Sequence, residues 1–160
     1  MDHVDRILEQ WNRERPDLDV APMGLFGRLA RLRIHVAREI EKTLLAHGLN
    51  SASFDVLATL RRSGPPYRLS PGDLIATTMV SSGTMTNRLD QLEKAGLIER
   101  SHNPDDRRGV IIALTPKGLA LVDEAVTAHV ENEHRLLESL DAGERGALDG
   151  LLRKFLKDFE

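Results

Sequence analysis

The stretch that decides the fold is Ser81–Thr115, SSGTMTNRLDQLEKAGLIERSHNPDDRRGVIIALT. Its first part has the pattern of an amphipathic helix, because Met85, Leu89 and Leu92 recur at spacings of four and three residues and so share one face. Gly96 suits the position just past the helix end, where a left-handed backbone is common. The pattern therefore predicts a helix with one buried stripe.

A second face of the same helix is short and polar. Thr, Asn and Gln side chains on such a face can reach the edges of bases in the major groove of DNA. Bulky apolar side chains are nearly absent from it, so the face is suited to solvent or to a polar partner. The helix residues predicted to face DNA are Ser82, Thr84, Thr86, Asn87 and Gln91.

A β-hairpin is predicted directly after this helix. Its strands are Leu97–Arg100 and Val110–Leu114, and the segment Asn103–Asp106 between them contains the Asn, Pro and Asp residues that favour tight turns. Arg107 and Arg108 lie at the tip or on the return strand, and arginines on a protruding hairpin can enter a narrow minor groove. A helix followed by an arginine-tipped hairpin predicts a winged helix-turn-helix.

These residues resemble the MarR family of bacterial transcription regulators. The shared motifs occur in the same order, and they are Ser81-x-x-Thr84-x-Thr86-Asn87-Arg88, Leu92-Glu93-Lys94-x-Gly96-Leu97-Ile98, Asp106-x-Arg108 and Leu114-Thr115-x-x-Gly118. The resemblance implies that Asp106 braces the wing arginine and that Arg108 enters the minor groove. It also implies a DNA-binding homodimer that acts on transcription and is not an enzyme.

The rest of the chain is predicted to be helical, which makes the protein mainly α with a small β-wing. Helices are expected at residues 2–15, 23–47, 52–62, 72–77 and 116–140, and after a cap at Asp141. We expect a single domain of residues 1–160, with a winged helix-turn-helix lobe at 51–118 and dimerisation helices at 1–48 and 119–160.

The terminal helices carry more apolar surface than a small winged lobe can cover. This favours a homodimer, and the alternative is that the terminal helices fold back onto their own lobe. A two-fold dimer would place two recognition helices about one DNA turn, roughly 34 Å, apart on a palindromic operator.

The composition sets further limits on the class of protein. The chain has 160 residues and no cysteine, which excludes disulfides and thiol-based redox sensing. No apolar run approaches the ~18 residues of a membrane span, and the first residues lack the pattern of a secretory signal, so we expect no membrane partner and a cytoplasmic location.

The net charge of −3 is unevenly distributed. Residues 59–118 contain nine basic and six acidic side chains, whereas residues 119–160 contain five and ten. A modest basic region on an acidic body fits DNA binding by the winged segment, although mild asymmetry of this kind is common in proteins.

Four further residues, Trp11, Asp55, Arg88 and Arg100, resemble the urate-responsive branch of the MarR family. The shared context includes an N-terminal helix with a Trp and the stretch Gly48–Asp55. The resemblance implies that these four residues bind a small anionic effector such as urate, another purine or a tricarboxylate, and that binding releases DNA. The chemistry is compatible, since an arginine can hold an oxyanion by two parallel hydrogen bonds.

Each of the four residues also has a simpler interpretation. Asp55 near a helix start favours the helix dipole, and Trp11 can be an apolar anchor in the dimer. Arg88 can reach DNA, and Arg100 can contact phosphate or pair with Asp105 or Asp106.

Other functions have less support in the sequence. There is no Gly-x-Ser-x-Gly elbow and no phosphate-binding glycine loop, so we expect no enzyme, no cofactor and no metal site. The leading hypothesis is a ligand-responsive regulator, most simply a repressor. One alternative is a constitutive architectural DNA-binding protein without an effector, and another is a winged module that binds protein.

Overall fold

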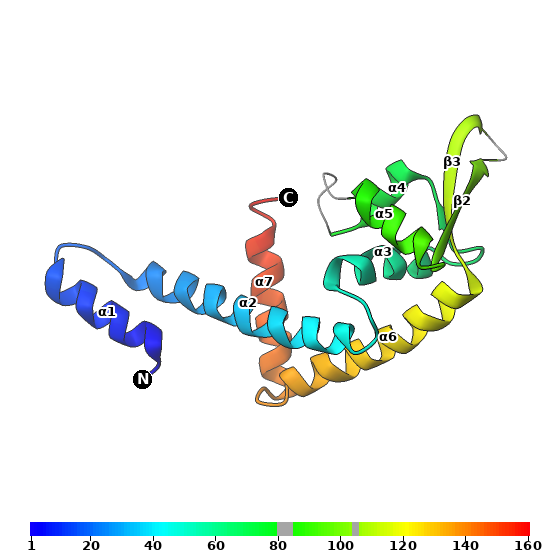
Figure 1. Ribbon diagram of the computed structural model, residues 1–160. Helices are drawn as coiled ribbons and strands as arrows, with labels where there is room; N and C mark the ends of the chain where they lie inside the picture. The colour runs from blue at the N-terminus through cyan, green and yellow to red at the C-terminus, as the bar shows by residue number, and fades with distance from the viewer. Residues whose placement is uncertain (80–84, 104–105) are drawn as a thin grey trace. The chain divides into compact units, whose positions relative to one another are not determined.

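The computed structural model describes residues 1–79, 85–103 and 106–160, with only the backbone at residues 106–108. The chain forms two compact units, Met1–Glu39 and Ile40–Glu160. The helices are α1 (His3–Glu14), α2 (Ala21–Leu45), α3 (Ser51–Arg62), α4 (Pro71–Thr77), α5 (Met85–Lys94), α6 (Pro116–Leu136) and α7 (Ala142–Leu156), and the strands are β1 (Arg68–Leu69), β2 (Ile98–Asn103) and β3 (Asp106–Leu114) (Figure 1). The prediction of a mainly α fold with a small β-wing is confirmed.

The first unit is built from α1 and the beginning of α2. Asp2 caps α1 by accepting hydrogen bonds from the backbone N–H groups of Val4 and Asp5. Arg28 of α2 forms ion pairs with both Asp2 and Asp5. Gly27 lets α2 approach α1 closely, because a Cβ atom there would lie 3.2 Å from a methyl group of Val4.

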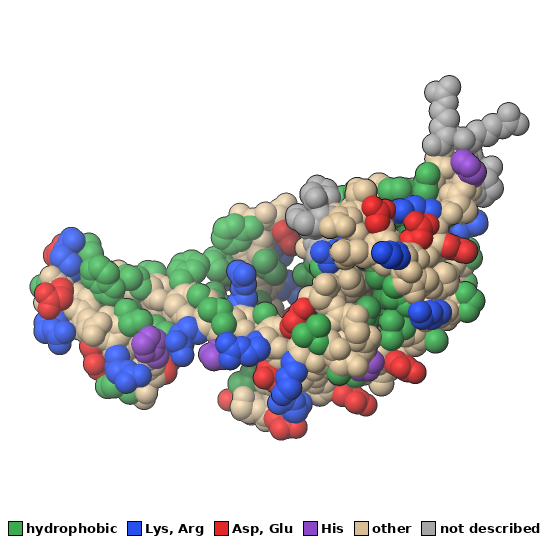
Figure 2. Space-filling model, in the orientation of Figure 1, with side chains coloured by type: hydrophobic (Ala, Val, Ile, Leu, Met, Phe, Trp, Pro, Cys, Tyr) green, Lys and Arg blue, Asp and Glu red, His purple; other side chains and the backbone are tan. Residues whose placement is uncertain are grey.

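Much apolar surface of the first unit faces solvent in the single chain. Hydrophobic side chains are visible on the surface of α1 and α2 in Figure 2. The exposed large apolar side chains of α2 in this unit are Met23, Leu25, Phe26, Leu32 and Ile34.

In the second unit, α3, α4 and α5 precede the hairpin. The side chain of Asn50 caps α3 by accepting a hydrogen bond from the Ser53 N–H. The side chain of Ser70 caps α4 by accepting a hydrogen bond from the Asp73 N–H. Gly96 follows α5 with φ of 71°, which confirms the predicted left-handed residue past its end.

The core of this unit lies where α3 meets the other elements. Apolar side chains from the helices and the sheet bury one another here, so the position of each helix is set by packing. The fully buried apolar side chains include Leu57, Leu60, Leu74, Ile98, Ile112 and Val122.

The sheet has the antiparallel strand order β1-β3-β2. The two strands of the hairpin pair with Ile98 opposite Leu114 and Arg100 opposite Ile112, and both run further toward the tip than predicted. Strand β1 was not predicted at all. It has two residues, too few to show an alternating pattern, and it exists because Arg68 and Leu69 pair with β3.

The C-terminal helices carry a further exposed apolar surface. Helix α6 ends at Leu136, four residues earlier than predicted, and α7 starts after the predicted Asp141 cap, which forms a capping box with Glu144. The exposed large apolar side chains of α7 and the residues after it are Leu148, Leu151, Leu152, Leu156 and Phe159. Within the described parts of the chain, no helix is both long and apolar enough to cross a membrane.

Candidate nucleic-acid interface

Helix α5 has the two faces that its sequence predicts. Met85, Leu89 and Leu92 are buried in the core of the second unit. Thr86, Asn87 and Gln91 are exposed, so their polar groups are accessible to a partner. Ser82 and Thr84, the other two predicted contacts, lie outside the described residues.

The segment at the end of α4 is held by two polar side chains of α3. Asp55, whose side chain is 14% exposed, accepts a hydrogen bond of 2.7 Å from the backbone N–H of Met79. Arg62 donates to the carbonyl of Thr77, the last residue of α4. Asp55 and Arg62 therefore tie the end of the first helix of the helix-turn-helix motif to α3, which is fixed in the core.

The wing is the hairpin of β2 and β3, which extends away from the helices of this unit (Figure 1). Asp106, Arg107 and Arg108 belong to β3 by backbone pairing. Their side chains lie outside the described residues, so the predicted brace between Asp106 and Arg108 stays a prediction.

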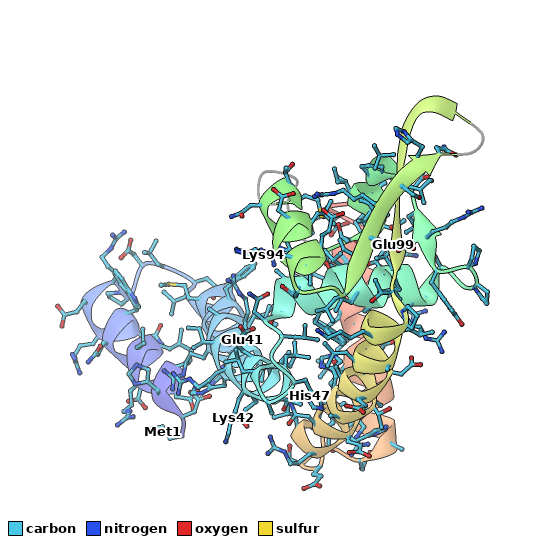
Figure 3. The ribbon with its side chains drawn as sticks, turned by 45° about the vertical axis from the view of Figure 1, so that its right-hand side comes forward. Met1, Glu41, Lys42, His47, Lys94 and Glu99 are labelled. Atoms are coloured by element: carbon cyan, nitrogen blue, oxygen red, sulfur yellow. The ribbon has the colours of Figure 1, made fainter. Side chains whose placement is uncertain are left out.

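Arg100 joins the wing to α5. Figure 3 labels Lys94, the last residue of α5, and Glu99 in β2, which immediately precedes Arg100. The Arg100 guanidinium donates to Asp90 and to Glu93, each at 2.6 Å. The hydrogen bond to Asp90, with the charges of Glu93 and Asp90, raises the pKa of Arg100 above its usual value, so it is a permanent cation.

The sequence interpretation of Arg100 did not include these contacts. Among the residues whose side chains the structure describes, its partners are Asp90 and Glu93 of α5. The alternative pairing with Asp105 or Asp106 involves side chains outside the described residues and stays a prediction. Asp90 and Glu93 were not singled out from the sequence. The available signal was that they are separated by one helical turn, next to a tight helix-to-strand connection.

Arg88 lies at the edge between the buried and exposed faces of α5. One of its terminal nitrogens, Nη1, is 3.4 Å from Oδ1 of Asn50, the residue that caps α3. Its Nε is buried and has no hydrogen-bond partner among the residues that the structure describes. Arg88 therefore has a buried donor that no described residue satisfies.

The four residues predicted to bind an effector are distributed over both units. Trp11, 40% exposed, belongs to α1 in the first unit, whereas Asp55, Arg88 and Arg100 belong to the second. Within the second unit each of the three binds a different partner: Met79, Asn50 and the pair Asp90–Glu93, respectively. The assembly of the four into one site stays a prediction.

Comparison with known proteins agrees with the winged helix-turn-helix. The model of the MarR family matches residues 49–110. The HTH-type transcriptional regulator PecS of Dickeya dadantii (strain 3937) is 42% identical over 154 residues, which are 96% of this chain and 93% of PecS.

Two solved structures are also similar. A structure described as the mechanism for regulation of DNA binding of Bordetella bronchiseptica BpsR by 6-hydroxynicotinic acid aligns with a TM-score of 0.71 and 32% identity, over 81% of this chain and 90% of that one. A mutant MarR from E. coli in complex with operator DNA aligns with a TM-score of 0.72 and 28% identity, over 91% of this chain and 97% of that one.

Proposed function

The chain belongs to the MarR family of transcriptional regulators, and on this premise we propose that it is a repressor that binds a palindromic operator as a homodimer and leaves it when a small anion binds. The observation that carries the proposal is the exposed polar face of α5. Thr86, Asn87 and Gln91 lie there without bulky apolar neighbours, opposite a fully packed stripe. Such a face can enter a major groove and form hydrogen bonds with base edges.

The wing supplies the second contact with DNA. Arg108, braced by Asp106, enters the minor groove beside the half-site, and Arg107 adds positive charge at the same place. Minor grooves that are narrow have a strong negative potential, which attracts arginine. Thus α5 reads the sequence, and the wing strengthens and orients binding.

A homodimer accounts for the exposed apolar surface of the terminal helices. Leu151, Leu156 and Phe159 of the C-terminal segment are more than half exposed in the single chain. A contiguous apolar surface of this kind is typical of an interface between protein chains. A two-fold dimer would present two copies of α5 to two half-sites about one DNA turn apart.

Substitutions at Asn87 and Arg108 test how the lobe docks on DNA. Asn87→Ala is expected to remove about 1–3 kcal/mol of discrimination between the operator and a mutated operator, because a base-edge contact is lost. Arg108→Ala is expected to weaken binding to all sequences, and to lower the salt slope of log K by about one unit if its contact is to phosphate. Fluorescence anisotropy with both DNAs over a range of salt concentrations measures both effects.

The docking model would be wrong if both variants bound as the unchanged protein does. A matched control is Arg153→Ala, which removes an exposed arginine of α7 whose ion pair with Asp149 lies far along the sequence from the lobe. This variant should keep both the affinity and the salt slope.

The effector half of the proposal rests on Arg88. Its unsatisfied buried Nε and its position on α5 link a ligand directly to the helix that reads DNA. A bound anion would add hydrogen bonds to Arg88 and repel a charged Asp55, whose carboxylate holds the entry to α5 through Met79. Trp11 and Arg100 complete the proposed site, and urate, another purine or a tricarboxylate is its proposed ligand class.

The effector test is operator binding at fixed salt with and without urate, xanthine, hypoxanthine and aconitate. We expect one of them to release the unchanged protein and to leave an Arg88→Ala variant bound. About 1–3 kcal/mol of coupling, roughly a 5- to 150-fold change in affinity, is enough for a switch. Specific binding that ignores every anion would keep the regulator and leave the four-residue site without a demonstrated ligand. Weak sequence preference together with no response to any anion would instead support an architectural DNA-binding protein without an effector.

A further inference from the structure

One residue of the wing makes three hydrogen bonds to α5. The Arg100 side chain donates from Nη1 to Oε2 of Glu93 and from Nη2 to Oδ1 of Asp90, both at 2.6 Å. Its backbone N–H donates to the other oxygen of Glu93, Oε1, at 3.2 Å. We name the three residues Arg100, Asp90 and Glu93 the wing clamp.

The clamp lies at the outer edge of the packed base of the wing. Leu97 and Ile98 are buried, so the core already fixes the place where the hairpin leaves the lobe. Arg100 is two residues closer to the tip than Ile98 and lies opposite Ile112, which is also buried, whereas Ser101 and His102 beyond it are exposed. The clamp therefore joins α5 to the wing at the last position before the exposed part of the hairpin.

Its geometry is more restrictive than that of an isolated surface ion pair. A planar guanidinium contacts two carboxylates one helical turn apart, while the backbone of the same residue holds the second oxygen of Glu93. The Arg100 side chain is 29% exposed, less than those of Asp90 at 59% and Glu93 at 39%. Such contacts add little to the stability of folding, because solvent screens the charges, but they restrict relative orientation.

The clamp also changes the charge that α5 presents. Asp90 follows Thr86 by one helical turn, so its carboxylate lies on the same face as the residues proposed to enter the major groove. An unpaired carboxylate beside DNA phosphates would be repelled. Arg100 neutralises this charge without itself occupying the polar face.

We propose that Arg100 is a positioning residue for operator binding, which holds the wing at a fixed angle to α5 so that helix and wing reach the same half-site together. The inference rests on the proposed DNA-binding function and deepens it. It assigns to Arg100 a role in the DNA-bound form, whether or not an effector exists.

The test compares Arg100→Gln with the unchanged protein on operator DNA. We expect the dissociation constant to rise about tenfold at fixed salt, with little change in melting temperature. Hydroxyl-radical footprinting should show loss of protection at the minor groove under the wing. Methylation interference at major-groove purines should persist, because α5 keeps its place in the core. A simple loss of folded protein would weaken both the minor-groove protection and the methylation interference.

Two further variants make the result specific. The exchange Glu93→Arg with Arg100→Glu restores one ion pair with reversed polarity, and it should recover part of the wing protection. The matched control is Arg61→Gln, which removes an arginine bridge between α3 and α6, to Asp123, that involves no residue of the clamp. This control should leave the footprint unchanged.

Three outcomes would overturn the proposal. Unchanged operator affinity and footprint in Arg100→Gln would show that the clamp is dispensable. A salt slope lower by about one unit would assign Arg100 to a phosphate instead. Loss of the response to an anion with intact DNA binding would assign it to the effector site. Absence of specific binding by the unchanged protein would refute the proposed function itself.

Discussion

Gly118→Ala is expected to lower the free energy of unfolding by about 3–5 kcal/mol, the largest effect of a single added methyl group at any glycine that the structure describes. A Cβ atom at position 118 would lie 1.9 Å from the carbonyl oxygen of Leu97 and 2.9 Å from its carbonyl carbon. These are backbone atoms, so no side-chain rotation can relieve the overlap. The same carbonyl also accepts the N–H of Thr115, which holds the start of α6 against the start of β2.

The matched control for this substitution is Gly146→Ala. Gly146 lies inside α7, and a Cβ atom there would meet nothing within 4 Å. Alanine favours helix over glycine by about 1 kcal/mol, so this variant should be as stable as the unchanged protein or slightly more stable. Chemical denaturation at one fixed protein concentration measures both, since dimerisation would couple stability to concentration. Equal stability of the two variants would mean that α6 is not seated on Leu97.

Gly118 also shows how a resemblance and a physical reason differ. The sequence places it in the motif Leu114-Thr115-x-x-Gly118, but the motif does not say why glycine is required. The reason appears only when α6 and β2 are placed together, because the contact joins Leu97 to a residue one long hairpin further along the chain. The spacing of apolar residues indicates which face of a helix is buried. It does not indicate how closely the backbone of that helix approaches another segment.

The elements themselves could largely be predicted, because their signals are local. Spacing of apolar residues indicated α3 and α4, and the cap at Asp141 indicated the start of α7. Strand β1 could not be predicted, since its two residues form a strand only by pairing with β3.

The candidate site likewise has one part that local sequence patterns predict and one part that depends on tertiary contacts. The polar face of α5 follows from helical spacing alone, and the exposure of Asn87 and Gln91 agrees with it. The partners of Arg100 and Asp55 depend on tertiary contacts. Arg100 pairs with α5 across a tight connection, and Asp55 binds a backbone N–H 24 residues away, so neither partner follows from the spacing of apolar residues.

Leu151→Glu is expected to convert the protein into a monomer and to weaken operator binding about 100-fold or more. Leu151 is 66% exposed in the single chain, so glutamate there should leave the fold of each chain intact. In a dimer built on α7 the same carboxylate would be buried against apolar side chains. The free energy needed to bury this unpaired charge exceeds the free energy that one apolar side chain contributes to such an interface. Two linked copies of α5 bind DNA more tightly than one copy by a factor of about 10²–10⁴, and this gain in affinity would be lost in a monomer.

Sedimentation velocity and binding to full and half operators separate the possible causes. The Leu151→Glu variant should sediment as a monomer, bind a single half-site as well as the unchanged protein does, and lose the extra affinity for the full palindrome. Arg153→Glu is the control, because it adds the same side chain to α7 at a position 75% exposed on the side away from Leu151. A Leu151→Glu protein that stays dimeric and binds the full operator normally would exclude α7 from the interface. The exposed apolar side chains of α2 would then be the surface on which the second copy must be sought, since half-site spacing still requires two linked copies of α5.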